Sequence, residues 1–157
     1  MRYRPSLLPG FATMWLAACA STPPNTLPSA PPPPHNAIRE ALLEDALGEI
    51  GRPYVYGGAD VDGFDCSGLT HHVYAEAGVS LPRTAAQQRQ SGRTIPFADA
   101  APGDLVFYRF GNGLHVTIYV GHGKVVHAPS SGESVTVTDV DTPFWRGHYL
   151  ETVRVLH

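Results

Sequence analysis

The sequence is short of cysteine and of charge. It has two cysteines among 157 residues, Cys19 and Cys66, and Cys19 falls in a segment that resembles a targeting signal, so we do not expect a disulfide. Charged residues make up 16% of the chain, the formal net charge is −3, and no basic patch stands out, which argues against nucleic acid as a partner. Hydrophobic residues reach 43%, which is enough for one globular domain.

The N-terminal segment has the pattern of a secretory signal. Arg2 and Arg4 give it a short positive region, and residues 7–18 are mostly apolar and end in small side chains. The apolar run is too short to span a bilayer as a helix. Its end and the cysteine that follows, LAAC at 16–19, resemble the bacterial lipobox. In a lipobox a signal peptidase cuts before the cysteine, which becomes a lipidated N-terminus.

This resemblance implies a signal peptide over residues 1–18 and an acylated Cys19 that holds the chain in a lipid bilayer. The alternative is plain secretion, with cleavage near Ala18 or Ala20. The cysteine is followed by Ala20 and Ser21, so no aspartate is present to act as an inner-membrane retention signal. We therefore expect a lipid-anchored protein of the cell envelope that faces the periplasm, held in the outer membrane.

Residues 20–36 are expected to form a tether rather than a packed element. They contain seven prolines, a composition typical of a semi-rigid polyproline-type linker. At ~3.1 Å per residue, such a linker reaches on the order of 50 Å. The folded domain is then predicted over residues 37–157, a length that can bury about two-thirds of its chain surface. We expect this domain to be a monomer.

The first half of the domain is predicted to be helical. Residues 37–50 carry apolar side chains at a four-residue spacing, with Asn36 as the N-cap. Residues 66–77 show a second such pattern, and Asp65 is placed to cap its start. A short third helix is predicted to begin at Thr84, because this threonine and the glutamine three residues later have capping-box spacing.

The second half of the domain has the pattern of β-structure. Short segments rich in β-branched and aromatic residues alternate with glycine-rich turns. These segments are LVFYRF (105–110), HVTIYV (115–120), KVVHA (124–128), SVTVTDV (134–140) and HYLETVRVL (148–156). Helices followed by strands predict an α+β fold, with N-terminal helices packed on a small antiparallel sheet or barrel.

Cys66 stands at the predicted start of the second helix, within GFDCSGL at 63–69. Unpaired N–H groups and the positive end of the helix dipole favour a thiolate there, so we expect a lowered thiol pKa and a nucleophilic cysteine. The same N–H groups can stabilise an oxyanion on a substrate. The alternative is a small buried hydrophobic residue, which is what most cysteines are.

A nucleophilic cysteine needs a base, and the base needs an orienting group. Alternation along HVTIYV puts His115 on the face opposite the aliphatic side chains, and KVVHA puts His127 in the next strand. A hairpin around the GHG turn can make the two histidines neighbours, one as base and one as its orienter. The alternative is a zinc site of Cys66, His115 and His127, although zinc requires three or four converging ligands.

Six blocks of the domain follow one another in a characteristic order. They are PYVYGG (53–58), GFDCSGL (63–69), LPRTAAQQ (81–88), PGDLVFY (102–108), HVTIYVG (115–121) and KVVHA (124–128). Together they resemble the NlpC-type bacterial cell-wall cysteine peptidases, which are compact papain-like enzymes. The resemblance covers most of residues 37–128 and implies a papain-like α+β fold.

The resemblance also implies a set of catalytic residues. Cys66 matches the nucleophile, His115 matches the base that pairs with it, and His127 matches the third, polar member of a catalytic triad. No metal and no organic cofactor is implied. Further positions are associated with the substrate. Tyr56 matches an aromatic residue whose hydroxyl lies near the reacting carbonyl group.

Asp65 and Ser67, which flank the nucleophile, match positions that recognise the substrate's amino group. Two departures from the family's pattern bear on substrate preference. Thr117 stands where the family usually has glycine, so its side chain is expected to narrow the cleft. His71 and His72 stand where apolar or aromatic residues are more common.

The activity implied by the resemblance is hydrolysis of peptide bonds in the stem peptides or cross-links of peptidoglycan. The family implies bonds between D- and L-centres, either γ-D-glutamyl to diaminopimelate within a stem or D-alanyl to diaminopimelate in a cross-link. The sequence does not choose between these two bonds. Two alternatives stay open at this point: a related Cys/His thiol acyltransferase or amidase, and a non-catalytic cell-wall-binding lipoprotein.

Overall fold

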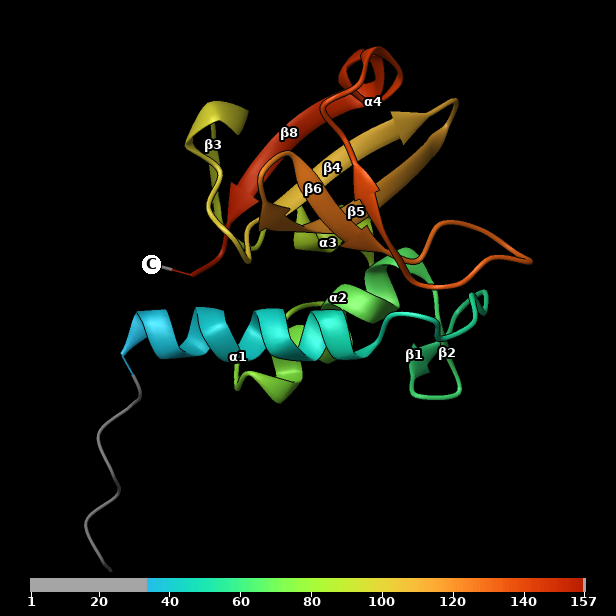
Figure 1. The fold of residues 1–157 in the computed structure, drawn as a ribbon, viewed down its shortest axis with the longest axis horizontal. Helices are drawn as coiled ribbons and strands as arrows, with labels where there is room; N and C mark the ends of the chain where they lie inside the picture. Colours follow the sequence, from blue (N-terminus) through green and yellow to red (C-terminus); the bar gives the residue numbers. More distant parts are fainter. Residues whose placement is uncertain (1–33, 157) are drawn as a thin grey trace, which may run out of the picture. The chain divides into compact units, whose positions relative to one another are not determined.

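The computed structural model of the chain describes residues 34–156. The predicted signal peptide, Cys19 and most of the proline-rich linker fall outside these residues. Within them, three helices lie on one side of an antiparallel sheet, and a fourth, short helix lies on the other (Figure 1). No helix in this part of the chain has the length and apolar character needed to cross a membrane. The arrangement confirms the predicted α+β fold.

The first helix, α1 (His35–Gly48), begins and ends two residues earlier than predicted. Its N-cap is Pro34, with φ −60° and ψ 146°, and no side chain caps the first turn. The predicted cap, Asn36, therefore lies inside the helix. Pro34 is itself extended, and a proline disfavours the helical conformation in the residue before it, so the helix starts directly after Pro34. The predicted apolar stripe is present, and Leu42 and Ala46 are its fully buried members.

Helix α2 (Cys66–Glu76) begins at the nucleophile candidate, as predicted, and Asp65 caps it by accepting a hydrogen bond from the N–H of Gly68. The short helix α3 (Ala85–Gln88) is capped by Thr84, also as predicted. Both caps were predicted correctly because capping depends on neighbouring residues alone. A short oxygen-bearing side chain reaches the N–H groups of the first turn.

The sheet has six antiparallel strands in the order β3-β8-β4-β5-β6-β7. Their bounds are β3 (Arg93–Ile95), β8 (Tyr149–Arg154), β4 (Leu105–Phe110), β5 (Gly113–Gly121), β6 (Lys124–His127) and β7 (Thr136–Asp139). The five predicted strands are all present. A separate two-stranded hairpin, β1 (Ala59–Asp60) with β2 (Gly63–Phe64), precedes α2 and was not predicted.

Three further short elements were not predicted. They are β3, the 3₁₀ turn η1 (Phe97–Asp99) and the helix α4 (Pro143–His148). The last strand was expected to begin at His148, but this residue closes α4 instead. The start of α4 follows the usual chemistry, with Thr142 accepting a hydrogen bond from Trp145 N and a proline in the first turn.

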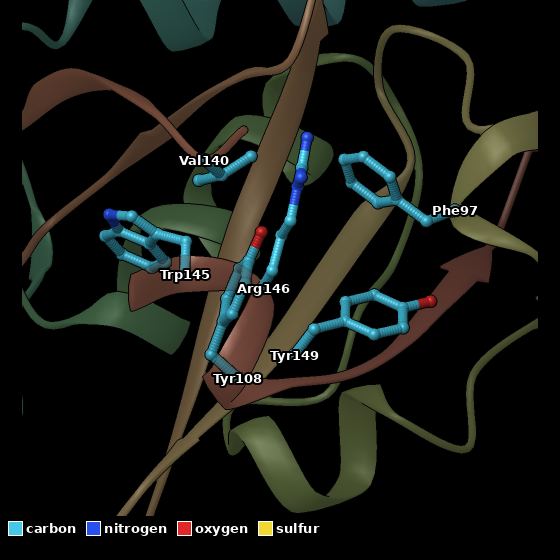
Figure 2. Close-up of a pocket in the computed structure, with 6 residues that line it drawn as sticks. All are labelled: Phe97, Tyr108, Val140, Trp145, Arg146 and Tyr149. Atoms are coloured by element: carbon cyan, nitrogen blue, oxygen red, sulfur yellow. The ribbon is translucent and has the colours of Figure 1, made fainter. Parts of the chain in front are cut away.

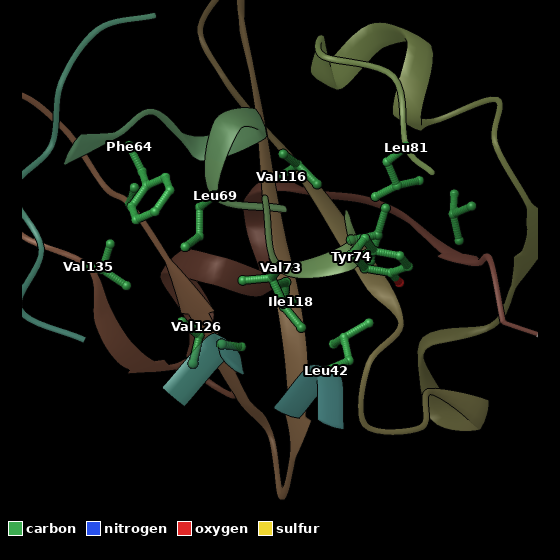
Figure 3. Packing of buried hydrophobic residues seen from close by; sticks show 14 of the residues in the cluster. Leu42, Phe64, Leu69, Val73, Tyr74, Leu81, Val116, Ile118, Val126 and Val135 are labelled. Atoms are coloured by element: carbon green, nitrogen blue, oxygen red, sulfur yellow. The ribbon is translucent and has the colours of Figure 1, made fainter. Parts of the chain in front are cut away.

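The strands bury side chains on both faces. On β4, Leu105 and Phe107 join the core between the sheet and α1 and α2, whereas Val106 and Tyr108 join a second cluster on the opposite face. Figure 3 shows the first cluster, in which Leu69 of α2 packs among side chains of the sheet. Burying each such large apolar side chain stabilises the fold by about 1.5–3 kcal/mol. This packing fixes α2, and therefore Cys66, against β5.

Candidate active site

Cys66 is the first residue of α2, and its thiol lies against the backbone of β5. The backbone N–H groups of Val116, Ser67 and Cys66 itself act to lower the pKa of the thiol. The sequence predicted a lowered thiol pKa for Cys66. This predicted direction is wrong for a Cys66 thiol that has no cationic partner. Burial raises the pKa of Cys66 and the charge of Asp65 adds to this, outweighing the N–H groups. A thiolate at this position therefore needs a cation as its partner.

The start of α2 is pressed against the turn that precedes β1. The N–H of Asp65 donates to the carbonyl of Gly58 over 3.1 Å. A Cβ atom added at Gly68 would collide with this same carbonyl oxygen. Glycine is therefore required two residues after the cysteine because backbone approaches backbone there.

The Asp65 carboxylate is the centre of a network around the helix start. Its two oxygens accept hydrogen bonds from Gly57 N, Ser67 Oγ, Gly68 N and both terminal nitrogens of Arg83. Although burial raises the pKa of Asp65, the hydrogen bonds from Arg83 and Gly68 outweigh it and lower the pKa. Arg83, which the sequence analysis did not single out, thus neutralises Asp65. The two predicted amine-recognising residues are bound to partners within the chain.

His115 and His127 are brought together by the β5–β6 hairpin. Its two-residue turn, His122 and Gly123, has positive φ at both positions, 54° and 68°, as a type I′ turn requires. A β-bulge between Tyr119 and Gly121 then shifts the register by one residue, so that Ile118 pairs with Val126 and the two histidines are diagonal neighbours on one face. His115 Nε2 lies 2.8 Å from His127 Nδ1. The predicted proximity of the two histidines is thereby observed. Their facing nitrogens are hydrogen bonded to each other rather than directed at a shared ligand such as a metal ion.

Burial keeps both rings neutral. It lowers the pKa of His115 to about 3, with a further contribution from His127. It lowers the pKa of His127 to about 4, and the negative charge of Glu133 opposes it. Near neutral pH each ring therefore has one N–H and one lone pair. Among residues 34–156, no group of three or more His, Cys, Asp or Glu side chains is arranged to hold a metal ion.

The histidine pair continues to a residue that the sequence analysis did not identify. His127 Nε2 lies 2.9 Å from Oγ1 of Thr138 on β7. Thr138 is part of the predicted strand SVTVTDV, but nothing in that pattern indicates which of its threonines would reach a histidine. Its place depends on the register between β6 and β7, which pairs Val125 with Thr138.

Helix α4 shapes the cleft beside the histidine pair. A pocket of about 250 Å³ is lined by Phe110, His115, His127, Pro129, Phe144 and Trp145. Trp145 packs edge-on to His127, with ring centroids 5.3 Å apart and an interplanar angle of 89°. Trp145 also lines a second pocket of about 250 Å³ together with Phe97, Tyr108, Val140, Arg146 and Tyr149 (Figure 2). Its ring is therefore a wall shared by the two pockets.

A model of the NlpC/P60 family matches residues 51–154. The chain belongs to the NlpC/P60 family. The peptidoglycan endopeptidase RipB of Mycobacterium tuberculosis is 39% identical over 122 residues, which are 67% of this chain and 51% of RipB. The bifunctional muramidase/DL-endopeptidase CwlT of Bacillus subtilis is 38% identical over 121 residues, which are 74% of this chain and 36% of CwlT.

The fold agrees with solved members of the NlpC/P60 family. The structure of the peptidoglycan hydrolase RipB superimposes with a TM-score of 0.69 and 33% sequence identity, covering 78% of this chain and 67% of RipB. This match confirms the papain-like α+β architecture. The chain spans about half the length of RipB and about a third of CwlT, with 51% and 36% covered.

The predicted tyrosine of this NlpC/P60 domain is not the one that the structure puts beside the cysteine. Tyr56 is 89% exposed. Tyr54 instead packs, like Cys66, against the main core cluster. Burial raises the pKa of Tyr54, and the charges of Cys66 and Asp65 add to the effect. Tyr54 is therefore the better-placed phenol for contact with a group bound at the thiol.

The departures from the family's pattern also have defined positions. Thr117 is fully buried and donates from Oγ1 to the carbonyl oxygen of Val106 over 3.1 Å, so its side chain is bound into the sheet rather than projecting into the cleft. His71 is hydrogen bonded through Nδ1 to Leu81 O at 2.7 Å. His72 packs on Phe64, with ring centroids 5.2 Å apart.

Proposed function

We propose that this NlpC/P60 domain is a peptidoglycan endopeptidase, in which Cys66 is the nucleophile, His115 the base and His127 its orienter. The observation that carries the proposal is the hydrogen bond between the two histidines beside the strand segment that contacts the thiol. Support also comes from the relatives RipB and CwlT, whose names describe a peptidoglycan endopeptidase and a DL-endopeptidase.

The first step is attack of the Cys66 sulfur on the carbonyl carbon of a peptide bond. His115 uses Nε2 to contact His127, so Nδ1 is the nitrogen that takes the thiol proton. Burial makes each charge costly by itself, as the pKa directions of Cys66 and His115 show. Thiolate and imidazolium therefore form together, because their mutual attraction compensates for the loss of solvent.

The second step is collapse of the tetrahedral intermediate. Its oxyanion is stabilised by N–H groups at the start of α2 and by the hydroxyl of Tyr54. His115 protonates the departing amine, which leaves an acyl group on Cys66. A water molecule then enters, gives a proton to His115 and attacks the thioester. The C–S bond of the resulting tetrahedral intermediate breaks, the carboxylic acid product leaves, and the Cys66 thiolate takes the proton back from His115.

The substrate that we propose is a stem peptide or cross-link of peptidoglycan, cleaved between D- and L-centres. Residues 20–36 serve as the tether and acylated Cys19 as the anchor, so that the domain works at the outer membrane on the periplasmic side as a monomer. Tethering raises the local concentration of the domain at its substrate.

Liquid chromatography with mass spectrometry of muropeptides tests this function. Purified disaccharide-peptide monomers and cross-linked dimers are incubated with the chain and with its Cys66→Ala variant. Conversion of dimers to monomers identifies a cross-link endopeptidase, and shortening of monomers within the stem identifies γ-D-glutamyl specificity. No cleavage of either substrate, with Cys66 still open to thiol reagents, would contradict the proposed function and favour an acyltransferase or amidase.

A further inference from the structure

Thr138 ends a chain of hydrogen bonds that starts at the base. His115 Nε2 contacts His127 Nδ1 over 2.8 Å, and His127 Nε2 contacts Thr138 Oγ1 over 2.9 Å. The three residues lie on three successive strands, β5, β6 and β7. The register pairs His127 directly with Thr136, so Thr138 reaches the ring from the diagonal position.

The order of protons along this chain matters for the base. A neutral imidazole donates from one nitrogen and accepts at the other. If His115 is to take a proton at Nδ1, its Nε2 must carry a hydrogen that is donated to His127 Nδ1. His127 then carries its own hydrogen on Nε2, which points at Thr138. The hydroxyl oxygen of Thr138 can accept the hydrogen bond that this N–H of His127 donates.

The hydrogen bond from His127 to Thr138 becomes stronger as the reaction proceeds. When His115 becomes an imidazolium, positive charge spreads over the hydrogen bond to His127 and makes its Nε2–H a stronger donor. Within the described residues, the hydrogen bonds of the His127 ring are to His115 and Thr138. The other neighbours that bear on the ring are the edge-on indole of Trp145 and the charge of Glu133. A buried N–H without an acceptor is costly.

We propose that Thr138 is a positioning residue that accepts a hydrogen bond from His127 Nε2 and extends the catalytic unit to four members: Cys66, His115, His127 and Thr138. The inference rests on the catalytic roles proposed above. Thr138 does not touch the substrate. It holds His127 in the tautomer that can accept from His115, and it thereby stabilises the imidazolium of His115.

The test compares isosteric and conservative variants by the reactivity of the nucleophile. Thr138→Val keeps the shape and removes the acceptor, whereas Thr138→Ser keeps the acceptor. Thr136→Val is the matched control, because it makes the same change on the same strand, opposite His127, at a threonine without a hydrogen bond to the ring. The rate of alkylation by iodoacetamide is followed across the pH range at the Cys66 peptide by mass spectrometry, without substrate.

Thr138→Val is expected to slow alkylation of Cys66 near neutral pH by roughly fivefold to tenfold, the effect of losing about one hydrogen bond, and to shift its pH profile towards that of an ordinary thiol. Thr138→Ser is expected to restore the profile, and Thr136→Val to leave it unchanged. An unchanged profile in Thr138→Val would overturn the inference. Failure of serine to restore it, or an equal loss in Thr136→Val, would also do so.

Muropeptide cleavage by the same variants keeps the two proposals apart. If Thr138→Val slows alkylation but the unaltered chain cleaves no muropeptides, the positioning role of Thr138 is supported and the proposed substrate is refuted. If Thr138→Val cleaves muropeptides with the same rate and pH profile as the unaltered chain, the positioning role of Thr138 is refuted and the proposed function is supported. Thermal unfolding of each variant checks that the comparison is made between folded proteins.

Discussion

His127 presents Nδ1 to Nε2 of His115 at 2.8 Å, from the neighbouring strand of one hairpin. Both rings are largely withdrawn from solvent, with 4% of His127 and 9% of His115 exposed. A neutral ring in this position can offer a lone pair but not a negative charge. His127 therefore acts by fixing the orientation and the tautomer of His115. Any residue with a hydrogen-bond acceptor at the same point should retain part of this orienting effect.

This relationship predicts an ordering of His127 variants. An asparagine can offer its carbonyl oxygen to His115 Nε2, whereas an alanine leaves this N–H without a partner. We expect His127→Ala to reduce kcat/KM by about 10²–10⁴-fold, in line with other triads that lose their orienting residue, and His127→Asn to retain more activity. Muropeptide cleavage rates measure the difference. Equal activity of the two variants, or higher activity of the alanine variant, would be evidence against an orienting role.

The two neighbouring tyrosines provide a matched pair for the oxyanion. Tyr54 packs, like Cys66, against the main core cluster, whereas Tyr56 is 89% exposed. We expect Tyr54→Phe to lower kcat on the order of a hundredfold, because it removes one donor to the oxyanion, and Tyr56→Phe to change it little. The rates are compared under saturating substrate. The opposite order would restore Tyr56 to the role that the sequence resemblance gave it.

The buried histidines make stability depend on pH. The pKa of His115 falls from 6.5 to about 3 on folding and that of His127 falls from 6.5 to about 4. Below about pH 6.5 the unfolded chain thus binds more protons than the folded one, so the free energy of unfolding decreases as the pH is lowered towards the folded-state values. Each histidine adds up to about 1.4 kcal/mol per pH unit in this window.

Urea unfolding between about pH 7 and about pH 4.5 measures this slope, in a range above the titration of Asp65. His127→Asn serves as the control, since removing one of the two groups should make the dependence shallower. Stability that stays constant across the window would show that the histidines are not held neutral in the folded state.

Gly68 is predicted to be indispensable at the start of α2. A Cβ there would meet the carbonyl oxygen of Gly58, which also binds Arg83 and the N–H of Asp65. We expect Gly68→Ala to lower the free energy of unfolding by ~2–3 kcal/mol and to reduce activity. Gly48→Ala is the control, since an added Cβ meets nothing within 4 Å there. Similar effects of the two substitutions would rule out a close backbone contact at Gly68.

The features that could be predicted from sequence are those with local causes. Asp65 and Thr84 are correct caps because capping depends on a few successive residues. The His115–His127 pair was also predicted correctly, although its geometry depends on a β-bulge between Tyr119 and Gly121 that the sequence pattern did not indicate. The α+β fold follows from the change of pattern at the middle of the domain.

The features that were missed depend on tertiary contacts. Tyr54 and Tyr56 cannot be distinguished in PYVYGG, and the choice is made by the bridge between Tyr54 and Phe64. Thr138 requires the β6–β7 register. The Cys66 pKa was predicted from the helix dipole, but burial by the sheet decides its direction.

The most direct test of the account is to look for the acyl group on Cys66. The chain is quenched in acid during turnover of cross-linked and monomeric muropeptides, and its Cys66 peptide is analysed by mass spectrometry. Nucleophilic catalysis by Cys66 predicts an added mass equal to the acyl half of the cleaved peptide, held as a thioester that hydroxylamine removes and absent from Cys66→Ala. Undiminished muropeptide cleavage by Cys66→Ala would contradict it.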